Sequence, residues 1–272
     1  MIRSSSEPGP SWLGIGAQRG GTTWLTDLIA RHPKVSLTAG RRGSPQKELQ
    51  LLHKVAEGLE DEQEYRDRFP SRKGQLVGEW TPLYLTFLAV PAVAERVCQA
   101  EAPYFAVLRD PIERYASSMR LWTKRSMRLW TKRSQSAAPP GPGAAIPWRI
   151  APQVAHAQWC GMYADQLDAW ARVSGRDRLV VLTYEEAVRD PQAACVRMWK
   201  AMGADPVPIG DADEPTDLMR NDPARHAARP GDWQWPDTLK DQLLALYRPQ
   251  VQRLRDEWGV DISTWPNFAD MT

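Results

Sequence analysis

The sequence predicts an α/β fold in which a central parallel sheet is flanked by helices on both faces. Short apolar runs typical of buried strands alternate with stretches that have helical periodicity. The segments that carry candidate chemistry follow these apolar runs, as expected where ligands bind beyond the carboxyl ends of parallel strands. With 272 residues, 42% of them hydrophobic, the chain has the size of a single domain spanning residues 1–272.

The N-terminal part predicts a strand, loop and helix unit. The apolar segment Ser11–Ala17 indicates a strand, and Thr22–Arg31 has apolar side chains at helical spacing after a glycine pair. A further helix is expected at Gln46–Glu57. Gln75–Gly78 then predicts a second strand, which leads into a site-facing loop at Glu79-Trp80-Thr81-Pro82.

Two more strands and a long helix complete the predicted fold. Tyr104–Leu108 is the clearest buried strand, with Arg109-Asp110-Pro111 at its carboxyl end and a helix after it. Leu179–Thr183 is another strand, followed by Tyr184-Glu185-Glu186. The segment Asp237–Gly259 has the apolar periodicity of one amphipathic helix. The sheet would thus present several polar segments at one edge.

Composition excludes several classes of protein. The 35 Lys and Arg residues nearly balance the 33 Asp and Glu residues, so no broad basic surface for nucleic acid is expected. No long apolar stretch predicts a membrane span, and we expect a cytoplasmic protein without a membrane partner. The three cysteines are far apart and are expected to be buried and reduced, in neither a disulfide framework nor a metal site.

The middle of the chain contains an exact tandem repeat. The octapeptide MRLWTKRS occurs at Met119–Ser126 and again at Met127–Ser134. It predicts a solvated extension of the preceding helix that ends in a Pro- and Gly-containing loop. The alternative is a cationic lid over an acceptor site, formed by an insertion at about residues 119–150.

The loop after the first strand has the chemistry of a phosphate cradle. A glycine-rich turn before a helix presents unpaired N–H groups and the positive end of the helix dipole. The segment GAQRGGTTWL supplies three glycines for close approach, two hydroxyl groups and one fixed positive charge, from Gly16, Gly20, Gly21, Thr22, Thr23 and Arg19.

The loop departs from the Walker A pattern of nucleoside triphosphatases and kinases. When Gly16 and Gly21 are aligned with the two Walker glycines, Thr22 occupies the position of the essential lysine. A nucleotide kinase is therefore disfavoured but stays an alternative, as does a phosphate-binding module without catalytic activity.

A second anion site is indicated at the end of the Tyr104–Leu108 strand. Arg109 leaves the strand and Ser117 follows eight residues later on the helix, so a guanidinium and a hydroxyl could clamp one phosphate. Arg-Asp-Pro is also a common helix start, in which Asp110 caps the helix and Pro111 occupies its first turn. Both interpretations fit the sequence.

Together these segments resemble the 3′-phosphoadenosine-5′-phosphosulfate (PAPS)-dependent sulfotransferases, particularly the bacterial and heparan-sulfate-type branch. Gly16-Ala17-Gln18-Arg19-Gly20-Gly21-Thr22-Thr23 is similar to the 5′-phosphosulfate loop of the family. Arg109, Asp110, Pro111, Arg114 and Ser117 match its 3′-phosphate motif. Weaker matches are Lys47-Glu48-Leu49, Glu79-Trp80-Thr81-Pro82, and Leu182–Glu186 with Asp190-Pro191.

The resemblance implies a P-loop-like sulfotransferase fold, and PAPS as co-substrate with adenosine 3′,5′-bisphosphate as product, without a metal. It implies a hydroxyl of a small molecule or sugar as the acceptor. The residues it assigns to the 5′-phosphosulfate are Arg19, Gly20, Gly21, Thr22, Thr23 and Trp24. Those it assigns to the 3′-phosphate are Arg109 and Ser117, with Arg225 and Arg229 as a second contact.

The resemblance also assigns catalytic roles. Glu48 is the expected general base, with Lys47 beside the transferring group and His53 as the rival base. Arg19 replaces the usual loop lysine, so it is expected to act through its charge rather than as a proton donor.

The thirteen tryptophans, together with Trp80 and Tyr84 near a strand end, indicate an acceptor with apolar or stacking surface.

Overall fold

The computed structural model describes residues 9–38, 46–70, 73–133, 151–210, 235 and 238–272. Its sheet has five strands, all parallel, in the order β2-β3-β1-β4-β5. The predicted α/β fold with a central parallel sheet is thereby confirmed. The strands are β1 Trp12–Gly16, β2 Val35–Leu37, β3 Leu76–Trp80, β4 Tyr104–Leu108 and β5 Leu179–Thr183.

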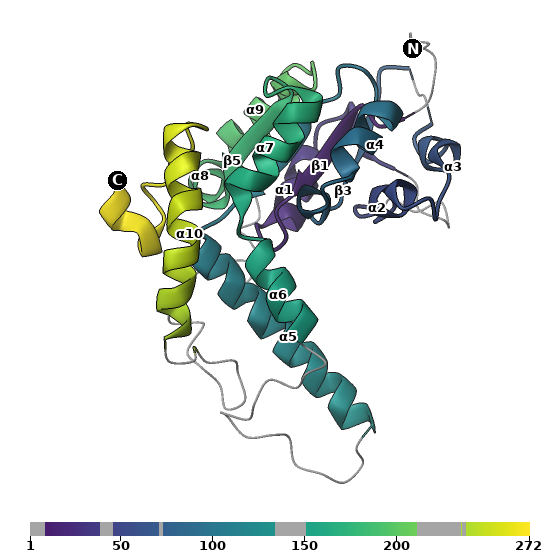
Figure 1. Ribbon diagram of the computed structural model, residues 1–272. Coiled ribbons are helices and arrows are strands. Elements are labelled where there is room, and N and C mark those ends of the chain that lie inside the picture. Colours follow the sequence, from purple (N-terminus) through teal and green to yellow (C-terminus); the bar gives the residue numbers. More distant parts are fainter. Residues whose placement is uncertain (1–8, 39–45, 71–72, 134–150, 211–234, 236–237) are drawn as a thin grey trace.

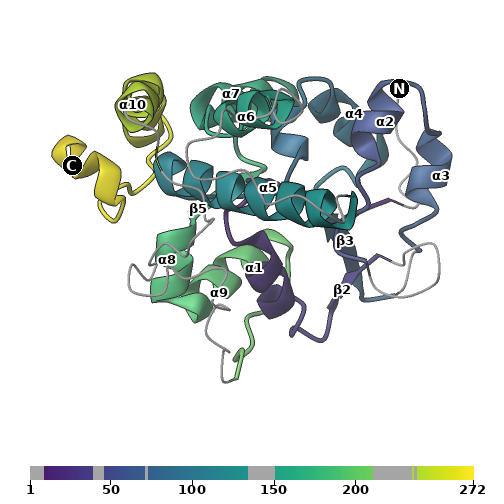
Figure 2. The same cartoon turned by 90° about the horizontal axis from the view of Figure 1, so that it is seen from below.

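Helices cover both faces of the sheet (Figures 1 and 2). One face carries α1 Thr22–Ile29, α8 Tyr184–Arg189 and α9 Pro191–Ala201. The other carries α2 Leu52–Ala56, α4 Val90–Val97 and α7 Tyr163–Ser174, with α10 Leu239–Asp256 packed beside α7. The remaining elements are α3 Glu62–Arg66, α5 Pro111–Arg133, α6 Ala151–Trp159 and the 3₁₀ turns η1 Tyr84–Thr86 and η3 Pro266–Met271.

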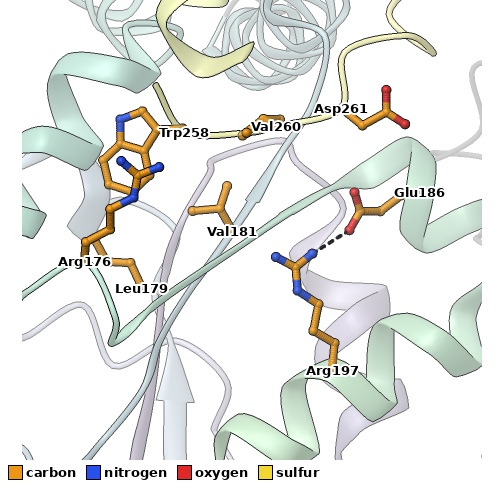
Figure 3. A pocket seen from close by; sticks show the side chains of 9 residues that line it. Arg176, Leu179, Val181, Glu186, Arg197, Trp258, Val260 and Asp261 are labelled. Carbon is orange, nitrogen blue, oxygen red and sulfur yellow. Dashed lines mark hydrogen bonds and ion pairs between the residues drawn. The ribbon is translucent and has the colours of Figure 1, made fainter. Parts of the chain in front are cut away.

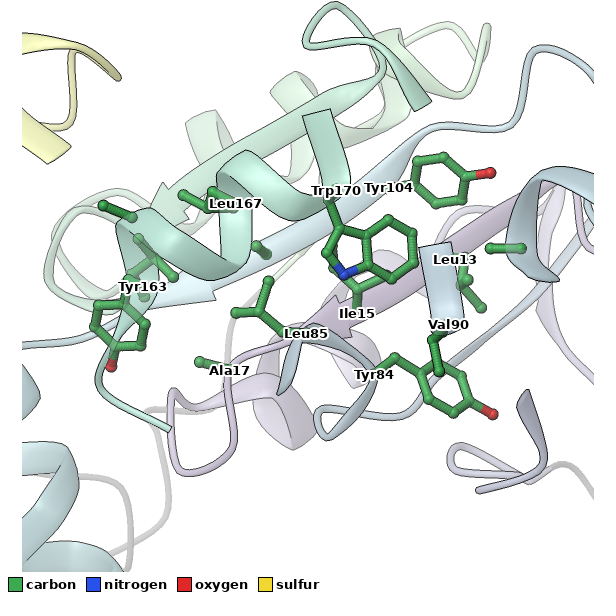
Figure 4. Close-up of a cluster of buried hydrophobic side chains, with 14 of the residues drawn as sticks. Leu13, Ile15, Ala17, Tyr84, Leu85, Val90, Tyr104, Tyr163, Leu167 and Trp170 are labelled. Atoms are coloured by element: carbon green, nitrogen blue, oxygen red, sulfur yellow. The ribbon is translucent and has the colours of Figure 1, made fainter. Parts of the chain in front are cut away.

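Two hydrophobic clusters fill the layers above and below the sheet. Successive side chains of a strand point to opposite faces, so Leu13 and Ile15 of β1 join one cluster while Trp12 joins the other. Figure 4 shows the first cluster, where Trp170 of α7 packs over the sheet near Ile15 and Tyr104. Burial on both faces explains why β1 and β4 are apolar throughout.

The aromatic and sulfur-containing residues serve mainly the core. Among the described residues, five tryptophans are fully buried, namely Trp12, Trp80, Trp170, Trp199 and Trp265. Tyr84 is also fully buried, so the expectation that Trp80 and Tyr84 present a stacking surface to an acceptor is wrong. Cys98, Cys160 and Cys195 are free thiols and all three are buried, as predicted.

Several element boundaries differ from the predictions. The helix expected at Gln46–Glu57 is confined to Leu52–Ala56, whereas the second predicted strand continues to Trp80. The three-residue strand β2 was not predicted, because a run as short as Val35–Leu37 has no recognisable periodicity.

The tandem repeat continues a helix. α5 begins at Pro111 and extends through the first copy and into the second as far as Arg133, so the predicted helical extension is present. Figure 1 shows this end of α5 reaching away from the sheet, with α6 lying along the helix nearer its base. The lid over residues 119–150 stays a prediction, and residues 134–150 lie outside the described part of the chain.

Candidate active site

The predicted site residues follow the carboxyl ends of the three central strands. The loop with Arg19 follows β1, Arg109 follows β4, and the Lys47–Glu48 segment pairs with the end of β3, where the Trp80 N–H donates to the Lys47 carbonyl at 2.8 Å. β3, β1 and β4 are neighbours in the sheet. Segments far apart in the sequence are thus brought to one edge, as the parallel topology predicts.

The loop between β1 and α1 depends on two glycines. A Cβ on Gly20 would lie 2.3 Å from the carbonyl oxygen of Val107 in β4. Gly21 has φ +82°, and a Cβ there would lie 2.4 Å from the Tyr184 ring. The loop therefore packs tightly against β4 and the end of β5, and only glycine fits at these positions.

The first turn of α1 leaves donors available for an anion. No described side chain caps this turn, so its N–H groups point out of the helix end. Thr22 is buried, Thr23 is exposed, and Trp24 is packed in the core at 7% exposure. Trp24 could therefore contact a phosphate only through its backbone N–H.

The chain after Lys47 and Glu48 does not become helical at once, because its N–H groups are bound by side chains that follow β3 or end it. Leu49 N–H donates to the Glu79 carboxylate at 2.9 Å, and Gln50 N–H donates to the Thr81 hydroxyl at 3.1 Å. The Tyr84 hydroxyl accepts from the N–H groups of Leu51 and Leu52, at 3.0 and 3.2 Å. These bonds replace the i to i−4 bonds of a helix and correct the helix predicted over this segment.

Glu79 connects most of the hydrogen bonds that hold this segment. Its carboxylate is fully buried and also accepts from the Tyr65 hydroxyl at 2.9 Å and the Tyr84 hydroxyl at 2.8 Å. Burial raises the pKa of Glu79, and the hydrogen bonds from its neighbours oppose that rise. Glu79 thus shapes the Lys47–Glu48 segment without being available to a ligand itself.

Lys47 brings a positive charge to the start of α1. Its ammonium donates to the Thr22 hydroxyl at 3.1 Å and to the Glu48 carboxylate at 2.9 Å. Burial lowers the pKa of Lys47, although Glu48 and the other nearby carboxylates oppose the change. Thr22 stands where a Walker loop has its lysine, and the amino group next to it comes from the segment between β2 and α2.

The Glu48 carboxylate is held by two hydrogen bonds and is partly exposed. One carboxylate oxygen accepts from Lys47 and the other accepts from the Gln50 amide at 3.3 Å. The side chain retains 35% exposure, so it can meet a group that arrives from solvent. His53 belongs to another set of contacts: its ring stacks on Phe87 at 4.8 Å, and burial lowers its pKa.

Arg19 and Ser117 form a direct link that the sequence did not predict. The Nε of Arg19 donates to the Ser117 hydroxyl at 3.0 Å, which joins the loop after β1 to helix α5. Arg19 has φ +68°, a left-handed conformation that directs the side chain across the loop. The residues expected at the two ends of the donor are therefore in contact.

Arg109 is a buried cation at the end of β4. Its residue is 3% exposed, its guanidinium lies 5.0 Å from the centre of the Tyr184 ring, and its carbonyl accepts from the Tyr163 hydroxyl at 3.0 Å. Its Nε finds no hydrogen-bond partner among the described residues. A buried donor of this kind is costly unless a ligand satisfies it, so Arg109 fits an anion site.

The other residues of the Arg-Asp-Pro motif are structural. Asp110 is buried and caps α5 by accepting from the Ile112 N–H at 2.9 Å, so the helix-start interpretation also holds. Arg114 is fully buried and donates to the Ala157 carbonyl and, at 3.3 Å, to the Ser118 hydroxyl. It joins α5 to α6.

Two predicted residues lie outside the described part of the chain. Arg225 and Arg229 belong to residues 211–234, so a second contact to the 3′-phosphate stays a prediction. Among the described residues, no three His, Cys, Asp or Glu side chains gather as potential metal ligands.

Glu185 is a buried carboxyl near Arg109 that the sequence alone did not single out. It follows β5 and accepts from the Trp265 indole N–H at 3.0 Å and from the Asp110 N–H at 3.4 Å. Burial raises its pKa to about 7, although the charge of Arg109 and the two hydrogen bonds oppose the rise. The sequence feature that could have indicated it is the Tyr184-Glu185-Glu186 run directly after a predicted strand.

The raised pKa of Glu185 gives a testable pH dependence. Because the pKa of Glu185 is higher in the folded protein than in the unfolded chain, the protonated carboxyl stabilises the folded state. This stabilisation is complete below the pKa of the unfolded chain and is lost as the pH rises through 7. The free energy of unfolding of the wild type should fall by about 2–3 kcal/mol relative to Glu185→Gln between pH 5 and pH 8. Urea unfolding of both proteins at both pH values measures this, and a constant difference would contradict it.

One hollow among the described residues lies elsewhere, on the outer side of the edge strand β5 (Figure 3). It has a volume of about 330 Å³ and is bounded by Leu179, Val181 and the segment 258–261. Arg197 bonds Glu186 at 3.1 Å in its wall, and the Arg176 guanidinium stacks on Trp258 at 4.3 Å. None of the predicted site residues lines it, so it is not the donor site.

Two solved structures are similar to this chain, and the first of them shares its fold. A sulfotransferase from Alicyclobacillus acidocaldarius has a TM-score of 0.65 at 19% identity, over 97% of this chain and 99% of that chain. The sulfotransferase domain of the Synechococcus PCC 7002 olefin synthase has a TM-score of 0.48 at 19% identity, over 90% and 95% of the two chains.

A curated relative is the membrane-associated sulfotransferase kil1 of Dictyostelium discoideum, which is 29% identical over 124 residues. The match covers 43% of this chain and 24% of that relative, so this chain corresponds to only part of it. Among the described residues, no helix has the length and apolar character needed to cross a bilayer. The cytoplasmic location expected from the sequence stays a prediction.

The family model for the sulfotransferase domain matches residues 11–214. This stretch begins just before β1 and includes the loop with Arg19, the Lys47–Glu48 segment and Arg109. The match thus spans most of the chain and all five strands of the sheet. The chain belongs to the sulfotransferase domain family.

Proposed function

We propose that this protein transfers a sulfuryl group from PAPS to a hydroxyl of a small-molecule or carbohydrate acceptor. The observation that carries the proposal is the presence of two separate cationic positions at neighbouring strand ends. Arg19 and Lys47 lie at the loop after β1, and the buried Arg109 lies at the end of β4. A donor with phosphate groups at both its 5′ and 3′ positions matches two such positions.

The residues present fit such a donor. Gly20 and Gly21 let the loop pack closely against Val107 and Tyr184, and no described side chain caps the N–H groups of α1 that a phosphate would approach. Arg19, Thr22, Thr23 and Lys47 would hold the 5′-phosphosulfate. Arg109, whose Nε has no hydrogen-bond partner among the described residues, would bind the 3′-phosphate, with the Ser117 hydroxyl as a second donor.

The chain's own groups would divide the reaction between them. The donor supplies an activated sulfuryl group, whose bond to the phosphate oxygen breaks as the acceptor oxygen bonds to sulfur. Glu48 would take the proton of the acceptor hydroxyl, and its partial exposure leaves it accessible for this role. Arg19 and Lys47 would stabilise the negative charge that develops on the phosphate oxygen.

The link between Lys47 and Glu48 supports these roles. The ammonium holds the Glu48 carboxylate at 2.9 Å and the Thr22 hydroxyl at 3.1 Å, so base and donor loop are fixed relative to each other. A fixed arrangement of this kind removes part of the entropic cost of bringing reactants together.

Turnover of labelled PAPS tests the proposal. The protein would be incubated with PAPS carrying ³⁵S and a panel of phenolic, alcoholic and sugar acceptors, and in parallel with ATP carrying ³²P in the γ-phosphate and Mg²⁺. We expect ³⁵S to appear in an acceptor and no ³²P transfer. Phosphoryl transfer would identify a kinase, and donor binding without any ³⁵S transfer across the panel would favour a module without catalytic activity.

A further inference from the structure

The C-terminal segment of the chain reaches the proposed 3′-phosphate site. The backbone N–H and side-chain amide of Asn267 donate to one Asp110 oxygen at 3.1 and 2.9 Å, and the Trp265 indole donates to Glu185 at 3.0 Å. Asp110 directly follows Arg109 in the chain. Glu185 directly follows Tyr184, on whose ring the Arg109 guanidinium stacks. This segment lies beyond residues 11–214, which match the family model.

Arg109 and Glu185 are near each other without forming an ion pair. Glu185 directly follows Tyr184, whose ring lies 5.0 Å from the Arg109 guanidinium, and its carboxylate reaches the N–H of the residue after Arg109. No ion pair joins the Arg109 and Glu185 side chains within the described part of the chain. The Glu185 carboxylate is instead bound by the Trp265 indole and, at 3.4 Å, by the Asp110 N–H. The guanidinium stacks on Tyr184, and its Nε has no hydrogen-bond partner among the residues that the structure describes.

Buried charges normally pair when an opposite charge is within reach. Trp265 is fully buried, and its indole packs against Tyr163 with ring centres 6.5 Å apart, so its N–H has a fixed position. Tyr163 in turn donates to the Arg109 carbonyl. The same cluster thus fixes the backbone of Arg109 and the orientation of the Glu185 carboxylate.

We infer that Trp265 is a positioning residue for donor binding, which holds the Glu185 carboxylate away from Arg109 and so keeps the guanidinium available to a 3′-phosphate. Asn267 supports this arrangement through Asp110. The inference rests on the proposed function. It adds to that function a selective role for the C-terminal segment in recognising donors that carry a 3′-phosphate.

The variant Trp265→Phe tests the inference by removing the indole N–H. At pH 8.5, where Glu185 is ionised, the freed carboxylate would turn to Arg109 and compete with the ligand. Isothermal titration should then show binding of adenosine 3′,5′-bisphosphate weakened by about tenfold or more, the loss expected for a charged hydrogen bond. Binding of adenosine 5′-monophosphate, which has no 3′-phosphate, should change by less than about twofold.

The double variant Trp265→Phe/Glu185→Gln separates competition from loss of structure. Removing the charge should restore affinity for the bisphosphate to within about threefold of the wild type. Trp12→Phe is the matched control, because Trp12 is also fully buried and donates its indole N–H to a carbonyl at 3.1 Å, far along β1 from the loop. It should leave both affinities unchanged.

Each other outcome decides against the inference. Unchanged bisphosphate binding in Trp265→Phe overturns it, as does equal weakening for both nucleotides or a failure of Glu185→Gln to restore binding. If Trp265→Phe does not fold, Glu185→Gln alone decides: it should keep or strengthen bisphosphate binding, and weakening of more than about threefold would overturn the inference. A wild type that binds neither nucleotide would instead refute the proposed function itself.

Discussion

Replacing Glu48 with glutamine should lower turnover with PAPS by about 10²–10⁴-fold, the usual contribution of a general base. Glutamine keeps the size of the side chain and can still accept a hydrogen bond from Lys47, but it cannot take the proton of the acceptor. Affinity for adenosine 3′,5′-bisphosphate should stay near the wild-type value, because Glu48 is assigned to the acceptor. Initial rates with ³⁵S-labelled PAPS and titration of the product nucleotide measure the two effects.

His53→Ala is the matched comparison for Glu48→Gln. The His53 ring stacks on Phe87 and its Nδ1 is buried without a hydrogen-bond partner among the described residues. We therefore expect turnover within a few-fold of the wild type. The reverse pattern, a nearly normal rate for Glu48→Gln and a large loss for His53→Ala, would transfer the role of base to His53.

The second large effect is expected for Arg19. Arg19→Ala removes a charge next to the proposed 5′-phosphosulfate and the bond to Ser117, and kcat/KM for PAPS should fall by roughly 10²–10³-fold. Arg19→Lys keeps the positive charge that the chemistry requires and should retain much of the activity, although it loses the planar donor fork.

Steady-state rates at several PAPS concentrations measure this effect. Arg96→Ala is a suitable control, because Arg96 is an exposed arginine that pairs with Glu62 away from the site. It should behave as the wild type. Equal activity of Arg19→Ala and the wild type would contradict the role of Arg19, and inactive Arg19→Lys would show that the fork itself is required.

The sequence was sufficient where the structure is local. The loop after β1 and the end of β4 each combine an apolar run with the glycines or charges that directly follow it, and both lie where predicted. The central parallel sheet followed from the same runs. The family match to residues 11–214 agrees with the resemblance found in these two segments.

The sequence was insufficient where distant residues decide a local conformation. Residues 49–51 lie outside the helix because their N–H groups are bound by Glu79, Thr81 and Tyr84, and no periodicity in either segment records this pairing. The same holds for Trp265, which meets Glu185 across 80 residues of chain.

Nucleotide selectivity tests the central claim, that this site is built for a donor with both 5′ and 3′ phosphate groups. Isothermal titration would compare adenosine 3′,5′-bisphosphate with ATP, each with and without Mg²⁺. We expect the bisphosphate to bind without Mg²⁺ and at least about tenfold more tightly than ATP under either condition. Tighter binding of ATP in the presence of Mg²⁺, with weak or no binding of the bisphosphate, would contradict the account.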